Sequence, residues 1–355
     1  MTESTGVLVC GGGPAGMMLG LLLARAGLAV TVLEKHGDFL RDFRGDTVHP
    51  ATVRLMDELG LGEEPGFSLR MNTAATEWVR DGEKVVGARY RTADGHTGEI
   101  RAELTVGCDG RHSTLRREAG LVPKEFRVPF DVWWFRLPRS AEESAAPAGV
   151  TPVAKGVEAL ISLARDDYYQ VAYFTAKGSD ARLRAEGIES FRERIAGLRP
   201  EFADRVAGLA SMDEVFVLDV KLNRLKRWYL DGLLLIGDAA HAMSPAGGVG
   251  INLAIQDAVA AATILAEPLR RRAVTHADLA AVQRRRHRPT VVVQTGQRLL
   301  QRVMFEKQFA GKRSGPPKAL LFLSRVFPRL RTLPARFVGF GPRPGHAPGF
   351  ASRNP

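Results

Sequence analysis

The stretch from Val7 to Glu34 constrains the fold of this chain more than any other part of it. An apolar run leads into three glycines with the spacing Gly-x-Gly-x-x-Gly, namely Gly11, Gly13 and Gly16. A helix-forming apolar segment and a second β-rich run follow, and the second run ends at Glu34. Strand, glycine turn, helix, strand and acid in this order predict a dinucleotide-binding βαβ unit.

Each residue of the glycine turn has a physical role in such a unit. Gly11 permits the tight turn, Gly13 lets the backbone approach a pyrophosphate, and Gly16 lets the helix pack closely on the strand. The helix that begins with Pro14 and Ala15 directs N–H groups and partial positive charge at the phosphates. We therefore expect a phosphate-bearing cofactor at this turn.

The acid at the end of the second strand selects the cofactor. Glu34 lies 18 residues after Gly16, where a carboxylate accepts hydrogen bonds from ribose hydroxyls and repels a 2′-phosphate. The site thus favours FAD or NAD over NADP, and we count the adjacent Lys35 among its residues. Arg44, with Arg41 as second candidate, is predicted to give the pyrophosphate a cation, the alternative being an ordinary surface arginine.

The composition is that of a globular protein with a substantial core. The 355 residues are 45% hydrophobic, enough for one large domain or two ordinary ones. Residues 1–5 lack the basic region of a signal peptide, and no apolar run is long enough to span a membrane. Cys10 and Cys108 lie in apolar, strand-like contexts, which favours buried thiols over a disulfide. We expect a cytoplasmic protein without an integral membrane segment.

The net charge of +11 arises from the C-terminal part of the chain. Residues 270–355 carry 19 lysines and arginines against two acids. Because no recognition motif accompanies this charge, a solvated basic face is favoured over nucleic-acid binding. The apolar and basic stretch from Ala319 to Phe327 suits peripheral membrane contact, although packing against the protein body is favoured. The oligomeric state stays open.

The middle of the chain is rich in strands that do not alternate regularly with helices. After a helix at Pro50–Leu59, a β-meander attached to the dinucleotide fold is expected at Ser68–Thr76, Lys84–Arg91 and Glu99–Val106. Further strands are expected at Val128–Phe135, Ala159–Ala164, Tyr168–Thr175 and Val215–Lys221, with a helix at Ile188–Gly197. This region is interpreted as a mostly antiparallel layer that faces the substrate.

A second glycine loop follows a buried strand at Leu233–Ile236. Gly237 and Asp238 leave this strand at the sheet edge where open α/β folds bind ligands, so Asp238 is a candidate partner of a ribityl hydroxyl. The loop carries Pro245, Gly247 and Gly248. These three residues are flavin-loop candidates, and no catalytic residue is assigned.

A helix follows this loop, predicted from Ile251 to Ala266 and stopped by Pro268. Its beginning, at Gly250, Ile251 and Asn252, directs partial positive charge at whatever ring lies there. A reduced isoalloxazine is negative at N1 and the C2 carbonyl, so this arrangement makes a flavin easier to reduce. His241 is interpreted as structural, and no metal site is predicted.

Together these motifs resemble the FAD-dependent aromatic hydroxylases, the group A flavoprotein monooxygenases related to p-hydroxybenzoate hydroxylase. The resemblance spans residues 7–289 and rests on three motifs in order: the first glycine turn, Cys108-Asp109-Gly110, and Gly237-Asp238-Ala239-Ala240-His241 with Pro245 and its glycines. It implies FAD, with Asp109 near the pyrophosphate and a transient NAD(P)H path. It also implies oxygen transfer to an electron-rich aromatic or polyketide-like small molecule.

The predicted fold class is α/β. We expect a Rossmann-like FAD-binding domain in two pieces, residues 1–127 and 222–289, and an inserted, mostly antiparallel β substrate domain, residues 128–221, that is shortened. A basic helical C-terminal region, residues 290–355, completes the chain.

One departure from the resemblance affects the predicted activity. Only Gly60 to Ser68 separate two segments between which the relatives carry several tens of residues. An FAD-dependent monooxygenase is the leading hypothesis. An FAD reductase or dehydrogenase on the same scaffold is one alternative, and a flavin-binding protein with poor turnover is another.

Overall fold

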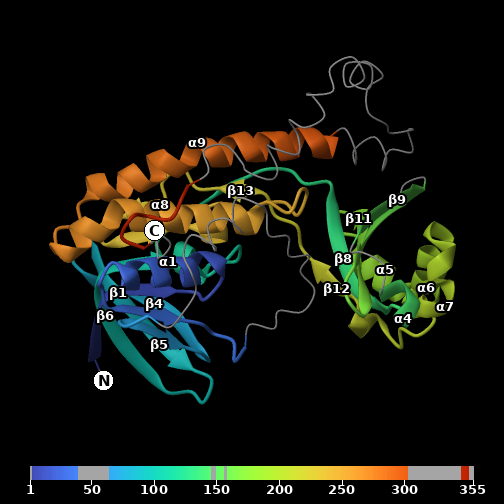
Figure 1. Ribbon diagram of the computed structural model, residues 1–355, viewed down its shortest axis with the longest axis horizontal. Helices are drawn as coiled ribbons and strands as arrows, with labels where there is room; N and C mark the ends of the chain where they lie inside the picture. Colours follow the sequence, from blue (N-terminus) through green and yellow to red (C-terminus); the bar gives the residue numbers. More distant parts are fainter. Residues whose placement is uncertain (1, 39–63, 145–148, 156–157, 303–344, 352–355) are drawn as a thin grey trace.

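The chain folds into two lobes, each built on one main sheet (Figure 1). The computed structural model describes residues 2–38, 64–144, 149–155, 158–302 and 345–351. The first lobe carries a largely parallel sheet with helices, and the second carries an antiparallel sheet with helices on its far side. The predicted α/β class is confirmed.

The sheet of the first lobe has the strand order β14-β15-β6-β1-β2-β3. Its strands are β1 (Thr2–Cys10), β2 (Val30–Leu33), β3 (Phe67–Arg70), β6 (Thr97–Gly107), β14 (Tyr229–Leu230) and β15 (Leu233–Leu235). All neighbours in this order except β14 and β15 are parallel. The pair β4 (Thr73–Asp81) and β5 (Lys84–Thr92) continues antiparallel from β6, which gives the expected meander.

Apolar side chains bury both faces of this sheet. Helices α1 (Pro14–Arg25) and α8 (Gly250–Arg270) cover one face, where Leu19, Leu22 and Leu265 are fully buried. Helix α9 (His276–Gln301) packs on α8 and extends toward the second lobe (Figure 1). The meander encloses the other face, where Trp228 has no exposed surface.

The second lobe is an antiparallel sheet of strand order β12-β8-β11-β10-β9. Its strands are β8 (Phe130–Pro138), β9 (Val150–Lys155), β10 (Glu158–Ala164), β11 (Tyr168–Ala176) and β12 (Phe216–Leu218). Helices α5 (Asp180–Ala185), α6 (Gly187–Leu198) and α7 (Ala203–Val206) cover the face away from the first lobe. On β8, Trp133 packs under these helices while Trp134 belongs to the opposite apolar face.

The remaining elements are short. They are α3 (Thr114–Glu118), α4 (Ala141–Ser144), the paired strands β7 (Lys124–Glu125) and β13 (Asn223–Arg224), and the 3₁₀ turns η1 (Pro200–Phe202), η2 (Met212–Glu214) and η3 (Gly237–Ala239).

Three predicted boundaries were wrong. The strand expected at Ser68–Thr76 is two strands, because the chain turns at Asn72 with a positive φ of 54°, and β3 joins the parallel sheet. The strand expected at Val215–Lys221 is confined to β12. Pro268 does not stop α8, because a proline in the last turn removes only one hydrogen bond near a helix end.

The predicted domain limits can be compared with the bounds of the observed helices and strands. Residues 128–221 contain all of the antiparallel sheet, whereas the limit at residue 289 falls inside α9, which continues through Pro289 to Gln301. The helix predicted at Pro50–Leu59 and the stretch Ala319–Phe327 lie outside the described residues.

Candidate functional site

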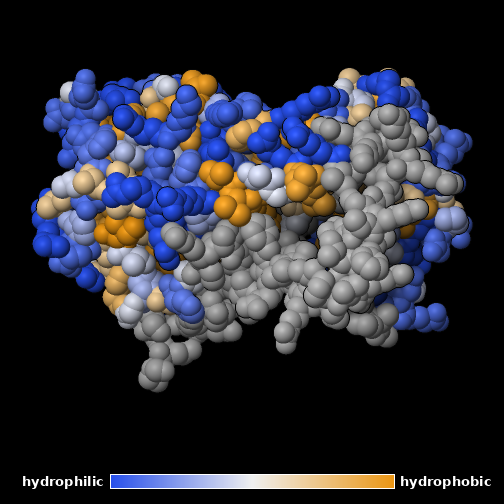
Figure 2. Space-filling model, turned by 90° about the horizontal axis from the view of Figure 1, so that it is seen from above, coloured by the Kyte–Doolittle hydropathy of each residue, from blue (hydrophilic) through white to orange (hydrophobic). Residues whose placement is uncertain are grey.

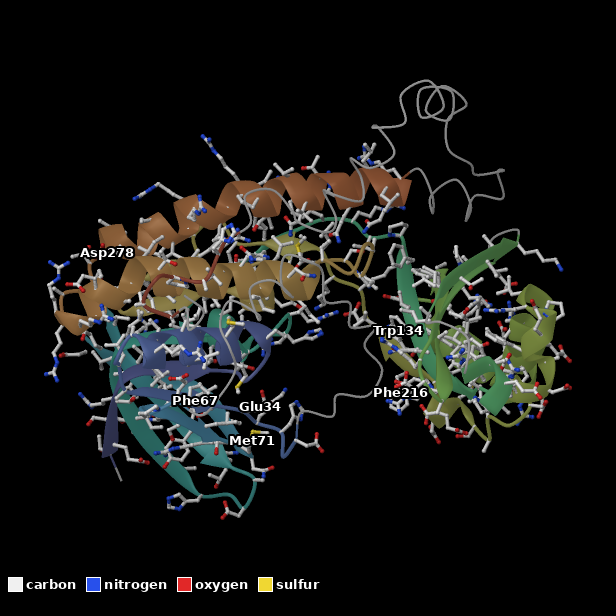
Figure 3. All side chains as sticks on the ribbon, in the orientation of Figure 1. Glu34, Phe67, Met71, Trp134, Phe216 and Asp278 are labelled. Carbon is white, nitrogen blue, oxygen red and sulfur yellow. The ribbon has the colours of Figure 1, made fainter. Side chains whose placement is uncertain are left out.

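Four parallel strands end at one edge of the first sheet, and each is followed by a residue of the predicted site. Backbone hydrogen bonds tie these ends together: Gly11 N to Leu33 O at 2.8 Å, and Cys108 N to Cys10 O at 2.7 Å. A third bond joins Ile236 N to Gly107 O at 3.1 Å. Glu34 lies at this edge, on the side of the first lobe that faces the second (Figure 3). The fold therefore brings the three sequence motifs to one place.

The first glycine turn has the geometry that its sequence predicts. Gly11 has a φ of +113°, and a Cβ there would lie 2.4 Å from Cys108 O. A Cβ on Gly16 would lie 2.0 Å from Gly11 O, so Gly16 allows α1 to approach the strand. Around Gly13, a Cβ would meet no described atom within 4 Å. Space for a ligand thus lies beside Gly13 at the start of α1.

Glu34 is almost completely buried, with 2% of its surface exposed. Its Oε2 accepts a hydrogen bond from Gly12 N at 2.9 Å, and its Oε1 accepts one from His36 N at 3.0 Å. A Cβ on Gly12 would lie 2.9 Å from the Glu34 Cβ, so Gly12 is a constrained position that sequence reasoning missed. Lys35 is exposed, and Arg41 and Arg44 lie outside the described residues.

The loop after β6 holds Asp109 through its own helix. The Asp109 carboxylate accepts hydrogen bonds from Ser113 Oγ and, at 3.1 Å, from Leu115 N at the start of α3. Arg116 is buried and donates to Arg111 O at 3.0 Å and to Ala239 O at 2.9 Å. It therefore connects the loop after β6 to the turn after β15.

Arg111 and Arg116 lie beside the candidate site, although neither was counted among the predicted site residues. Arg111 reaches Asp238 with 3.4 Å between Nη2 and Oδ2. The available signal was the basic run that follows the Asp-Gly pair.

The turn after β15 lies between the starts of α1 and α8. Gly237 has a φ of +60°, and a Cβ there would lie 3.3 Å from the Cβ atoms of Ala15 and Ala254. This contact places the neighbouring Asp238 beside the first glycine turn, as the combined motifs predict. The Asp238 side chain is 27% exposed, so its carboxylate is accessible to a ligand.

A buried cluster lies behind this turn. Asp257 on α8 accepts hydrogen bonds from Gly237 N at 3.1 Å, His241 Nε2 at 2.6 Å and Arg286 Nε at 2.8 Å. Burial raises the pKa of Asp257, but His241 and Arg286 outweigh it and hold this pKa below its ordinary value. His241 is 1% exposed, in agreement with the structural role expected from the sequence.

The second glycine loop leads directly into α8. Gly247 and Gly248 both have positive φ values, 83° and 61°, and Gly248 N donates to Pro245 O at 2.9 Å. Within the described chain, no side chain caps the helix that begins at Gly250. Ile251 is half-buried, and Asn252 Nδ2 donates to Gly248 O at 3.4 Å. The helix therefore presents backbone N–H groups at this loop, as predicted.

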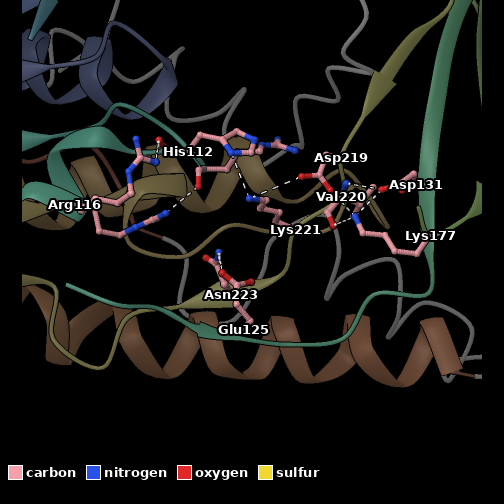
Figure 4. A network of polar contacts seen from close by, with 11 residues as sticks. His112, Arg116, Glu125, Asp131, Lys177, Asp219, Val220, Lys221 and Asn223 are labelled. Atoms are coloured by element: carbon pink, nitrogen blue, oxygen red, sulfur yellow. Dashed lines mark hydrogen bonds and ion pairs between the residues drawn. The ribbon is translucent and has the colours of Figure 1, made fainter. Parts of the chain in front are cut away.

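A polar network joins the site to the second lobe (Figure 4). Lys177 Nζ lies 2.6 Å from a carboxylate oxygen of both Asp131 and Asp219, and Lys221 Nζ lies 3.3 Å from His112 Nδ1. Burial, Lys221 and Arg111 lower the pKa of His112. A neutral His112 can therefore accept from Lys221 next to the Asp109 loop.

A family model described as an FAD binding domain matches residues 4–65 and 62–296. The chain belongs to this family. Across 397 aligned positions it is 32% identical to a 6-methylpretetramide 4-monooxygenase of Streptomyces rimosus, covering 95% of this chain and 92% of that protein. It is 26% identical to a rifampicin monooxygenase of Streptomyces venezuelae, covering 71% of this chain but only 62% of that protein. This FAD-binding chain is thus an FAD-dependent oxidoreductase of the monooxygenase group, as the sequence predicts.

Solved structures share the fold of this FAD-binding chain at low sequence identity. An anhydrotetracycline hydroxylase from Streptomyces rimosus aligns with a TM-score of 0.73 and 19% identity, over 95% of this chain and 76% of that one. A flavin-dependent brominase aligns with a TM-score of 0.74 and 17% identity, over 95% and 94%. These two structures establish the fold alone.

Two further observations concern the described residues. None of their helices is long and apolar enough to cross a membrane. Cys10 and Cys108 are free thiols rather than a disulfide, and burial raises the pKa of both. The prediction of free thiols is confirmed, and Cys10 is buried as expected while Cys108 is half-buried.

Proposed function

We propose that this chain hydroxylates a polycyclic aromatic or polyketide-derived small molecule, using FAD, NAD(P)H and O2. The observation that carries the proposal is the 32% identity, nearly end to end, to a monooxygenase of 6-methylpretetramide. Fold alone does not select this reaction, because a brominase and a Diels-Alderase share it.

The residues at the sheet edge fit FAD. Space lies beside Gly13 at the start of α1, and in the described chain no side chain caps that helix, so its N–H groups face a pyrophosphate. Glu34, at the end of β2 beside the first glycine turn, is the proposed partner of the ribose hydroxyls. Asp238, partly exposed beside Gly237, is the proposed partner of the ribityl chain.

In this proposal the protein binds and orients FAD and the substrate and shields them from water. Bound FAD supplies the transfer of electrons from NAD(P)H and of oxygen to the substrate. The N-terminus of α8 would stabilise negative charge on the ring, and the loop from Pro245 to Gly248 would hold the ring. Asp109 stays a proposed neighbour of the pyrophosphate and of the NAD(P)H path, and Lys35 and Arg44 stay proposed cofactor residues.

The second lobe has a buried apolar layer on its side toward the first lobe. The sheet face directed toward the first lobe carries flat and branched apolar side chains, among them Phe130, Val132, Trp134 and Phe174. Trp134 lies on the side of this lobe that faces the first (Figure 3). Trp134 and Phe174 keep 7% and 8% of their surface exposed, and we propose that a planar polycyclic molecule, rather than a small polar one, binds against this side of the lobe.

Two findings bear on the alternative of poor turnover. The family match falls into two segments that meet at residues 62–65, within the shortened connection. The alignment with the 6-methylpretetramide 4-monooxygenase is longer than this chain, so that relative has stretches without a counterpart here. The first finding locates a break in the family match at this connection, and the second shows that this chain is shorter than the relative over the aligned region.

The proposal is tested with purified protein. Bound flavin should be FAD, and NAD(P)H oxidation should be stimulated by tetracyclic phenols, with oxygen from labelled O2 incorporated into the product. A product that forms equally well without O2 would instead establish the reductase or dehydrogenase alternative.

The cytoplasmic location and the peripheral membrane contact of the C-terminal region stay predictions. Seen from the side where α9 lies, the described surface is mostly hydrophilic with small hydrophobic patches (Figure 2). Leu299 and Leu300 on α9 are 64% and 42% exposed.

A further inference from the structure

The inner face of α9 is unusual because much of it is polar. At spacings of three or four residues, one helical face carries side chains with no more than 5% of their surface exposed: Arg286, Thr290, Gln294, Gln297 and Gln301. Buried polar groups require hydrogen-bond partners, since an unpaired one destabilises the fold. What these side chains contact therefore indicates what the face does.

Three of these side chains, Arg286, Gln294 and Gln297, connect to residues 237–246, and Arg286 does so through Asp257. Arg286 binds Asp257, whose carboxylate accepts from Gly237 N. Further along the helix, Gln294 Nε2 lies 2.7 Å from Asn223 O and 3.3 Å from Ala242 O.

Gln297 completes the series at the second glycine loop. Its Nε2 donates to Ser244 O at 2.8 Å and to Ala246 O at 2.7 Å. These two carbonyls flank Pro245, and the segment between η3 and α8 has no regular secondary structure to satisfy them. The amide group of Gln297 thus donates hydrogen bonds to the backbone carbonyls on both sides of Pro245.

We propose that Gln297 is a positioning residue for the cofactor, which holds the Pro245–Gly248 loop in the conformation that receives the flavin. The inference rests on the proposed function, in which this loop lies under the ring. It adds the C-terminal part of α9 to the proposed site. Neither the family match, which ends at residue 296, nor the sequence prediction, which placed residues 290–355 in a separate region, includes Gln297 in that site.

The chain offers a matched control on the same helix. Gln283 also bridges two backbone groups, since its Oε1 accepts from Trp228 N at 3.0 Å and its Nε2 donates to Lys226 O at 2.7 Å. These partners precede β15 and are not part of the Pro245–Gly248 loop. Replacing either glutamine by methionine keeps the length of the side chain and removes both hydrogen bonds.

The experiment compares Gln297→Met with Gln283→Met. We expect both to lower the Tm, but only Gln297→Met to raise the Kd for FAD, by about tenfold, the effect of one lost hydrogen bond of ordinary strength. We also expect it to shift the visible spectrum of the bound flavin. In the apoprotein, hydrogen exchange of a peptide covering 242–252 should accelerate in Gln297→Met and stay unchanged in Gln283→Met.

Equal FAD affinities for the two variants, or unchanged exchange in the 242–252 peptide, would overturn the inference. If Gln297→Met does not fold, Gln297→Asn provides the same comparison, because it keeps the amide and shortens its reach by one methylene. If the wild-type protein binds no FAD, the proposed function fails, while the exchange experiment on the apoprotein still decides the role of Gln297.

Discussion

The glycines of the first turn constrain the chain in different ways. Gly11 and Gly16 are required by the protein itself, since a Cβ at either position would collide with backbone atoms. Gly12 is required by the side chain of Glu34. At Gly13 the described protein leaves space for a Cβ, so only a ligand gives a reason for glycine there.

This difference predicts that Gly13→Ala folds and loses FAD. Gly13 has a φ of −70°, which alanine adopts without strain, so the Tm of the apoprotein should change by only a few degrees. The added methyl group should lower FAD retention at least tenfold by keeping the pyrophosphate from the backbone. Fluorescence titration with FAD measures the loss, and Gly16→Ala, which should destabilise the fold, is the contrasting variant. Normal FAD affinity in Gly13→Ala would show that the pyrophosphate does not bind at this turn.

Asp238 is predicted to bind the ribityl chain with one charge-assisted hydrogen bond. Asp238→Ala should therefore weaken FAD binding by about 1.5–3 kcal/mol, or roughly 10- to 150-fold. Because the removed carboxylate also faces Arg111, Asp238→Asn is the better-matched variant and should lose less affinity. Equilibrium dialysis of FAD checks both variants. An unaltered affinity in folded Asp238→Ala would exclude this residue from the site.

At the scale of elements, tertiary contacts extend helices beyond their sequence signals. Pro289 lies in the middle of α9, where a proline costs a helix about 3 kcal/mol or more. The helix nevertheless continues, because the residues beyond it, Val293, Gln294 and Gln297, are buried against the first lobe. Packing and buried hydrogen bonds thus outweigh the local penalty.

The Glu3 carboxylate on β1 bonds to side chains of two other strands, and its contribution to the free energy of unfolding depends on pH. Glu3 binds Arg70 on β3 and Tyr90 on β5, and hydrogen bonding to Arg70 is the main reason that its pKa falls from 4.5 to about 2. A depressed folded-state pKa stabilises the protein above pH 4.5, and this contribution is lost as the pH falls from 4.5 toward 2.

Glu3→Gln should accordingly lower the free energy of unfolding at pH 7 by up to about 1 kcal/mol, since the pair is partly exposed. The difference from wild type should shrink toward pH 3. Chemical denaturation at both values measures it, with Glu77→Gln, which breaks an exposed pair with Arg89, as control. A difference that is the same at both pH values would contradict the ionic origin of the effect.

At the scale of the whole molecule, the proposed function requires that the two lobes enclose the substrate between them. The network of Figure 4 joins them through Lys177 and Lys221, close to the segments that connect β7 to β8 and β12 to β13. The connection at residues 60–68, by contrast, is much shorter in sequence than the several tens of residues that the resemblance implies. A site with fewer walls admits more water.

We therefore predict that NAD(P)H oxidation is substantially uncoupled, with hydrogen peroxide formed in excess over hydroxylated product, because water exclusion protects oxygen transfer. The measurement is the ratio of NAD(P)H consumed, peroxide released and product formed across phenolic and polycyclic substrates. One product per NAD(P)H would show that the remaining elements close the site unaided.

The local chemistry of the site could be predicted from the sequence. Clear apolar runs predict the strands that precede the glycine turn, Glu34, the Asp109 loop and the turn at Asp238. Parallel strands bring their carboxyl ends to one edge of the sheet, so these residues are expected to lie together. The fold class and the antiparallel second lobe followed in the same way, from periodicities that persist over whole strands.

Tertiary structure alone decided which distant side chains support that edge. Gln297 reaches the loop because α9 continues past Pro289 and lies on α8, and Arg286 reaches Asp257 on α8 from the part of α9 before that proline. Arg116 joins two loops more than a hundred residues apart. A glutamine or arginine on a helix has the same local pattern whether it faces water or a buried carbonyl. Only the packing of the helices determines which it meets, because such hydrogen bonds depend on the position of backbone groups far away in the sequence.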